Sequence, residues 1–142
     1  MLARLDKYGE TTIFLGMIDK SAKPVSWVGS SKKDFLAFPG DVQDAMGFAL
    51  FQAQIGQWHG SMKPLQGFGG AGVVELVENH QGDTFRSVYT VRFEEAVYVL
   101  HAFQKKSKRG VKTPPQDLAL IRSRLKAAEE HHRQHQNPKG SA

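Results

Sequence analysis

The stretch that decides the fold is Thr84–Gly110, TFRSVYTVRFEEAVYVLHAFQKKSKRG. Its first half alternates, with Phe85, Ser87, Tyr89 and Val91 on one side and Arg86, Val88, Thr90 and Arg92 on the other. Its second half alternates too, with Val97, Val99, His101 and Phe103 opposed to Tyr98, Leu100, Ala102 and Gln104. A period of two in β-branched and aromatic residues, broken only at 93–95, predicts an antiparallel hairpin.

The pairing of the two strands depends on where the hairpin turns. A turn centred on Phe93 and Glu94 would set Arg86 opposite His101 and Thr90 opposite Val97. A slip of one residue would move every side chain to the other face of the sheet, so the register is a working assumption.

A basic segment follows the second strand without an intervening acid. It contains Lys105, Lys106, Lys108, Arg109 and Lys112. A guanidinium and an imidazole on adjacent strands, leading into such a segment, could form a surface that handles phosphate. The net charge of +5 over 142 residues also favours a polyanionic partner.

Several classes of protein are excluded by composition. The chain has no cysteine, which excludes disulfides, a thiolate nucleophile and zinc sites with Cys ligands. Its apolar runs are too short for a membrane span, and the N-terminal segment lacks the features of a secretory signal. The default is a cytoplasmic protein without metal or cofactor; its oligomeric state is left open. His131, His132 and His135 are expected to be exposed at a fraying helix end.

The remaining elements indicate an α+β domain. Expected along the chain are a strand at 23–28, a short helical turn at 32–36, a helix from Asp41 as N-cap to Gly56, a loop at 57–72 and a strand at 73–77. A last helix should start at a Thr113–Gln116 capping box and fade near His132. Helices would therefore collect around one mostly antiparallel sheet.

The length suits one domain with flanking segments. Residues 1–22 are interpreted as an extension of uncertain role, either an interaction segment or residues that pack on nothing. Residues 23–133 form the expected domain, and 134–142 a flexible tail.

Three strings carry a resemblance to a known family: KPVSWVGSSKKDFLAFPGDVQDAMGFALFQAQIG, KPLQGFGGAGVVELVE and TFRSVYTVRFEEAVYVLHAFQKKSKRGVKTP. They resemble the phage-derived HigB-like toxins of the RelE superfamily, over roughly residues 23–133. The resemblance implies a RelE-like fold, with two N-terminal helices and a C-terminal helix on a small sheet. It also implies a toxin that cleaves mRNA without a metal, often on the ribosome, and a helix-turn-helix antitoxin as partner.

Metal-free RNA cleavage needs a base for the 2′-hydroxyl proton, cations for the transition-state charge and an acid for the departing 5′-oxygen. The resemblance implies that Arg86 contacts the scissile phosphate. His101 and Lys105 are the candidate acid–base groups at the end of the next strand. RNA contacts are expected from Lys63, Lys106, Lys108, Arg109 and Arg92.

The chain departs from RelE on the strand before Arg86. RelE carries lysines there, whereas this chain has Val74 and Glu75, and Lys63 is the nearest cation. This departure motivates an alternative function, a module on the same fold that binds RNA or a partner without cutting. Tyr98 and Phe103 could stack on bases, or pack in the core.

Overall fold

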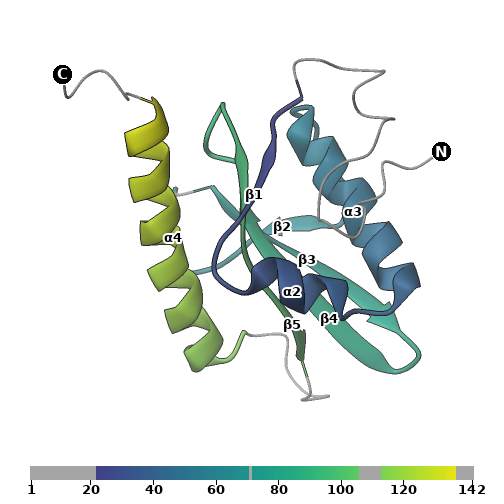
Figure 1. Cartoon of the computed structure of the whole chain (residues 1–142). Helices are drawn as coiled ribbons and strands as arrows, with labels where there is room; N and C mark the ends of the chain where they lie inside the picture. Colours follow the sequence, from purple (N-terminus) through teal and green to yellow (C-terminus); the bar gives the residue numbers. More distant parts are fainter. Residues whose placement is uncertain (1–21, 71, 106–112, 137–142) are drawn as a thin grey trace.

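The computed structural model describes residues 22–70, 72–105 and 113–136. These residues form one five-stranded sheet with helices on both of its faces (Figure 1). The elements are β1 (Val25–Trp27), α2 (Ser31–Leu36), α3 (Gly40–Gln54), β2 (Met62–Pro64), β3 (Val73–His80), β4 (Asp83–Thr90), β5 (Val97–Lys105) and α4 (Pro115–Gln136). The predicted α+β class, with two N-terminal helical pieces and a C-terminal helix, is confirmed.

The strands lie in the order β1-β5-β4-β3-β2. β1 pairs with β5 in parallel, and every other neighbouring pair is antiparallel. The predicted hairpin is therefore the centre of the sheet, since β4 and β5 each have a strand on both sides. Both faces of these strands are covered by helices, which accounts for their nearly unbroken burial.

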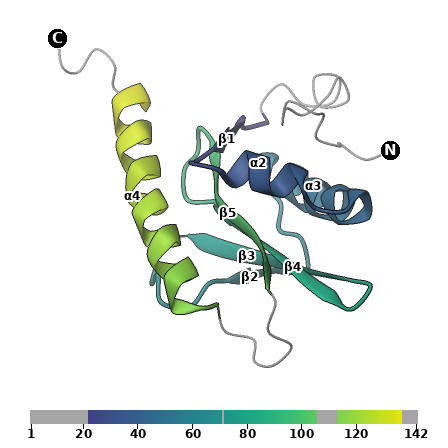
Figure 2. The same ribbon diagram turned by 60° about the horizontal axis from the view of Figure 1, so that its bottom comes forward.

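Two separate cores lie on the two faces of the sheet. On one face, Phe35 of α2 and Met46 of α3 pack with Tyr89 and Val99. On the other face, Ile121 and Leu125 of α4 pack with Val88, Leu100 and their neighbours. Figure 2 shows α2 and α3 together on one side of the sheet, with α4 standing apart from them alongside β5.

An irregularity in β5 changes which residues share a face. Val88 pairs with His101, whereas the next residue of β4, Tyr89, pairs with Val99, so Leu100 is an extra residue in β5. This β-bulge shifts the alternation by one position. Accordingly Val99 and Ala102, three residues apart, both belong to the core under α2 and α3.

The predicted register of the hairpin is wrong by one residue between the turn and the bulge, and by two residues beyond the bulge. Arg86 lies opposite Phe103, not His101, and Thr90 lies opposite Tyr98, not Val97. Up to Leu100 the predicted faces hold, and beyond it they are exchanged. The exchange turns His101 away from the α2 and α3 core and toward α4.

Several predicted boundaries also need correction. The helix α3 begins at Gly40 with Pro39 in the N-cap position, so Asp41 is not the cap, while Gly56 follows its end with a φ of 79° as expected. The helix α4 begins at Pro115, one residue later than predicted. It continues to Gln136, past His132. The short strand β2 lies within the segment predicted to be loop, paired with β3.

We expect Ile121→Ala to destabilise the protein by about 2–5 kcal/mol, the usual range for emptying a buried aliphatic site. Ile121 is fully buried and anchors α4 to the sheet. The measurement is the urea midpoint at unchanged m-value. The matched control is Leu120→Ala on the same helix, because Leu120 is 37% exposed. Its effect should stay within about 0.5 kcal/mol. Equal losses in both variants would contradict the packing described here.

Candidate active site on the α4 face of the sheet

Arg86 occupies the middle of a polar strip on the face that α4 covers. Its partner position on β5 is Phe103, and His101 and Lys105 lie two residues to either side of Phe103. Because side chains two apart in a strand share a face, Arg86 is diagonal to both His101 and Lys105. Such diagonal positions are roughly 7–8 Å apart. The bulge thus brings the three predicted catalytic residues onto one face.

The Arg86 guanidinium is held by a carboxylate from the next strand. Its Nη1 donates to Oε2 of Glu75 at 2.7 Å, and the two side chains are 5% and 15% exposed. Glu75 faces Val88, so it too is diagonal to Arg86. Arg86 Nε is buried and has no hydrogen-bond partner within the part of the chain that the structure describes. One edge of the guanidinium is therefore paired, and the other offers a donor.

The His101 ring is held on two sides. Its Nε2 lies 2.7 Å from Oδ1 of Asp117, in the first turn of α4. The ring stacks on Phe103, with centroids 4.6 Å apart and planes 18° from parallel. The other ring nitrogen, Nδ1, is buried and lacks a hydrogen-bond partner among the described residues. The ring orientation is thus set by α4 and Phe103 together.

Lys105 ends β5 on the same face, with its side chain buried. Burial lowers the pKa of Lys105, and the positive charge of Arg86 lowers it further, whereas Glu75 acts in the opposite direction. A lysine with a lowered pKa gives up its proton more readily than an exposed one. Lys105 therefore has the character of a proton donor beside Arg86.

The other predicted cations are distributed unevenly. Lys63 is exposed on β2 and faces Glu75, which places it beside the strip. Arg92 lies beyond the opposite end of β4, where its Nη1 donates to Oε2 of Glu129 at 2.6 Å. The structure does not bring Arg92 to the strip. The remaining three cations, Lys106, Lys108 and Arg109, lie outside the described residues.

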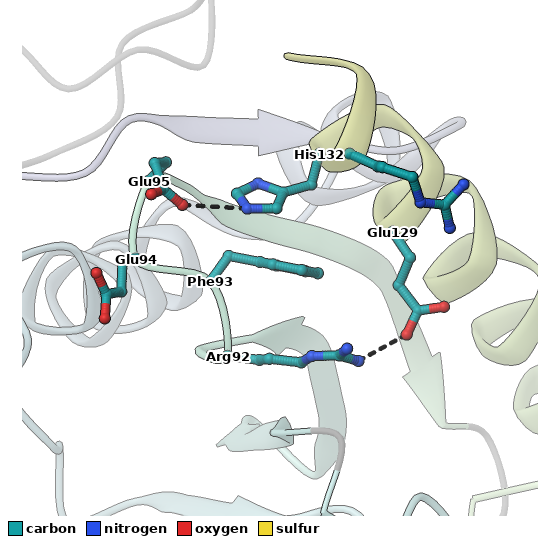
Figure 3. Close-up of a pocket in the computed structure, with 7 residues that line it drawn as sticks. Arg92, Phe93, Glu94, Glu95, Glu129 and His132 are labelled. Carbon is teal, nitrogen blue, oxygen red and sulfur yellow. Dashed lines mark hydrogen bonds and ion pairs between the residues drawn. The ribbon is translucent and has the colours of Figure 1, made fainter. Parts of the chain in front are cut away.

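The far end of α4 borders a polar pocket, shown in Figure 3. There His132 packs on the ring of Phe93, at 4.2 Å between centroids, and its Nε2 lies 3.1 Å from Glu95. His132 is buried, so the prediction of three exposed histidines is wrong at this position and right for His131 and His135. In the described ranges no group of three possible ligands could hold a metal ion.

Sequence reasoning missed both carboxylates of the strip. Glu75 was interpreted only as a departure from the lysines of RelE, although its register opposite Val88 sets it against Arg86. Asp117 gave no signal beyond an acid in the first turn of a helix. For Tyr98, which was expected either to stack on a base or to pack in the core, the structure supports the core: the residue is buried and its hydroxyl lies 2.9 Å from Nδ1 of His131.

The sheet and the helices on its two faces define a small α+β domain of the kind expected for the toxin resemblance. The family model described as phage-derived protein Gp49-like (DUF891) matches residues 33–126. The chain belongs to this family, which is a HigB-like toxin family of the RelE superfamily. The matched range includes the polar side chains described above: Glu75, Arg86, His101, Lys105 and Asp117.

Two other comparisons returned nothing: no curated protein and no solved structure matched the chain. Membership of a toxin family implies an antitoxin partner. Among the described residues, no helix is both long and apolar enough to cross a membrane.

Proposed function

We propose that the protein is the toxin of a type II toxin–antitoxin pair, a metal-free endoribonuclease that cuts mRNA on the ribosome and so inhibits translation. Family membership supports the toxin class. One observation supports the proposed chemistry. Arg86 and His101 occupy diagonal positions on adjacent strands, and one nitrogen of each side chain contacts a carboxylate. In each, a second nitrogen is buried without a hydrogen-bond partner in the described chain. Each of these nitrogens is able to make a hydrogen bond to a ligand.

The proposed reaction uses the three residues in distinct roles. The RNA 2′-hydroxyl attacks the adjacent phosphorus, and its proton passes to Nδ1 of His101. Arg86 binds the phosphate oxygens and stabilises the charge that develops on them. The bond to the 5′-oxygen breaks, and Lys105 supplies the proton that this oxygen takes up. The products are a 2′,3′-cyclic phosphate and a free 5′-hydroxyl, so atoms and charge balance.

The end groups of the fragments test this reaction directly. Purified protein is incubated with translating ribosomes and, separately, with free RNA, in the presence and absence of a chelator. We expect 2′,3′-cyclic phosphate and 5′-hydroxyl ends, with a rate that the chelator leaves unchanged. Fragments with 5′-phosphate ends, or a rate that depends on a divalent ion, would contradict the proposed chemistry. Cleavage of free RNA as well as translated message would remove the ribosome from the proposal.

Residues 23–133 are proposed as the toxin domain, acting in the cytoplasm, where translated messages occur. The matched family range lies within these bounds. The cognate antitoxin is proposed to be a helix-turn-helix protein, as the resemblance implies. RNA contacts are proposed for Lys63 on β2 and for Lys106, Lys108 and Arg109, which follow β5 in the sequence and lie outside the described residues. Arg92 could contact only RNA that continues along the sheet to its opposite end.

We expect Lys63→Gln to weaken RNA binding and flatten its salt dependence. A side chain that neutralises one phosphate of a single strand contributes about 0.7 to the slope of log Kobs against log salt. Lys63 is exposed beside Glu75, where it can reach a phosphate near the strip. The measurement is fluorescence anisotropy with a labelled RNA at several salt concentrations.

The matched control is Lys33→Gln, because Lys33 is exposed on α2, which packs on the other face of the sheet. Its slope should equal that of the wild type. Identical slopes for Lys63→Gln and wild type would show that RNA does not contact β2.

One observation favours the alternative of a non-catalytic binding module. Arg86, His101 and Lys105 are only 4%, 6% and 8% exposed, so substrate has little access to them in this conformation. A module of this kind would bind RNA or an acidic partner through its exposed cations. It would give salt-dependent binding and no fragments, with or without ribosomes.

A further inference from the structure

We propose that Asp117 is a positioning residue for His101, fixing the ring proton on Nε2 so that Nδ1 is left to accept the proton of the 2′-hydroxyl. This inference rests on the proposed function and adds a residue to it. Asp117 is not itself expected to touch RNA. Its role would be exerted entirely through the imidazole.

The contact between the two side chains determines the tautomer. An ionised carboxylate only accepts hydrogen bonds, so the 2.7 Å contact with Asp117 Oδ1 requires the hydrogen on Nε2. A neutral imidazole carries one ring hydrogen, and Nδ1 then has a free lone pair. Nδ1 is the buried ring atom without a partner among the described residues. The geometry thus assigns each nitrogen a separate task.

Three features make this contact rigid. Asp117 lies in the first turn of α4, where the helix dipole stabilises a carboxylate. That turn precedes Ile121, which is fully buried against the sheet. The Phe103 ring stacks on His101, so rotation of the imidazole ring would break the stacked contact. The packing of α4 therefore fixes the position of the Asp117 carboxylate, and the stacking on Phe103 restrains the ring that it contacts.

The protonation of the ring can be measured without any assay of activity. We would record ¹⁵N spectra of the histidine side chains at a pH where His101 is neutral, for wild type, Asp117→Ala and Asp117→Glu. We expect the Nε2–H form in wild type, a mixture of both forms in Asp117→Ala, and return toward Nε2–H in Asp117→Glu. A wild-type ring with its hydrogen on Nδ1, or one unchanged in Asp117→Ala, would overturn the proposal.

Kinetics then test whether the assigned tautomer is used. We expect Asp117→Ala to lower kcat by roughly 10–100-fold with KM nearly unchanged, less than the 10²–10⁴-fold for loss of an acid–base group itself. Asp117→Glu should recover part of the rate. Glu130→Gln, on the same helix and exposed, is the control for charge and should cleave like wild type.

The outcomes separate this inference from the proposed function. An altered ring tautomer with an unchanged kcat would overturn the positioning role, because His101 would then not carry the proton. A wild type that cleaves no RNA would overturn the proposed function. In that case the ring spectra would still show whether Asp117 fixes the ring hydrogen of His101 on Nε2. Asp117→Leu, which is close in size and cannot accept a hydrogen bond, replaces Asp117→Ala if the latter does not fold.

Discussion

We expect induction of the Arg86→Gln variant to leave bacterial growth and transcripts intact, whereas induction of the wild type arrests growth and creates new 5′ ends in translated messages. Arg86 is the cation at the centre of the strip, diagonal to both His101 and Lys105. Removing one donor to a charged transition state typically lowers kcat by about 10²–10³-fold. A loss of that size should abolish toxicity. Mapping of transcript 5′ ends after induction measures it.

A loss of folding must be separated from a loss of chemistry, because Arg86→Gln leaves the Glu75 carboxylate without its cation. Breaking one side of a buried ion pair costs about 3–5 kcal/mol. The Glu75→Gln/Arg86→Gln double variant removes both charges and should recover most of the stability without recovering cleavage. Arg133→Gln provides the surface control, since Arg133 pairs with Glu130 and is 70% exposed. Cleavage by the stable double variant would refute the role assigned to Arg86.

The second large effect is expected from His101→Gln, which should slow RNA cleavage by about 10²–10⁴-fold, the usual contribution of a positioned acid or base. Glutamine can still donate to Asp117 and fill part of the space beside Phe103, so the fold should tolerate it. The rate is measured with purified protein at saturating RNA. His135→Gln on the exposed face of α4 is the matched control. A folded His101→Gln variant with the wild-type rate would show that His101 is a core residue only.

The central hairpin and the helices could be predicted because their signals are local. Period-two alternation in β4 and in the first half of β5 follows directly from the pleat of a strand. The apolar stripe of α4, which includes Ile121 and Leu125, is likewise visible within two turns of helix. The end of α3 is marked by the glycine that directly follows it. Helices collected around one mostly antiparallel sheet then define the α+β class.

The candidate site was only partly predictable because it depends on register between strands. Arg86, His101 and Lys105 could be named from residue type and resemblance, yet their predicted pairing was wrong. The run Val97–Phe103 is apolar on both faces except for His101, so its pattern does not show where a β-bulge inserts an extra residue. Glu75 and Asp117 are 11 and 16 residues from their partners, and only tertiary packing brings them into contact.

The extra residue at Leu100 decides which face of the sheet the candidate catalytic side chains of β5 occupy. Before it, odd-numbered residues of β5 face α2 and α3; after it, odd-numbered residues face α4. If β5 instead alternated regularly through Leu100, without the bulge, the side chains of His101, Phe103 and Lys105 would all face the opposite core. Any alignment of this chain with a relative must therefore count the bulge before it transfers a catalytic role.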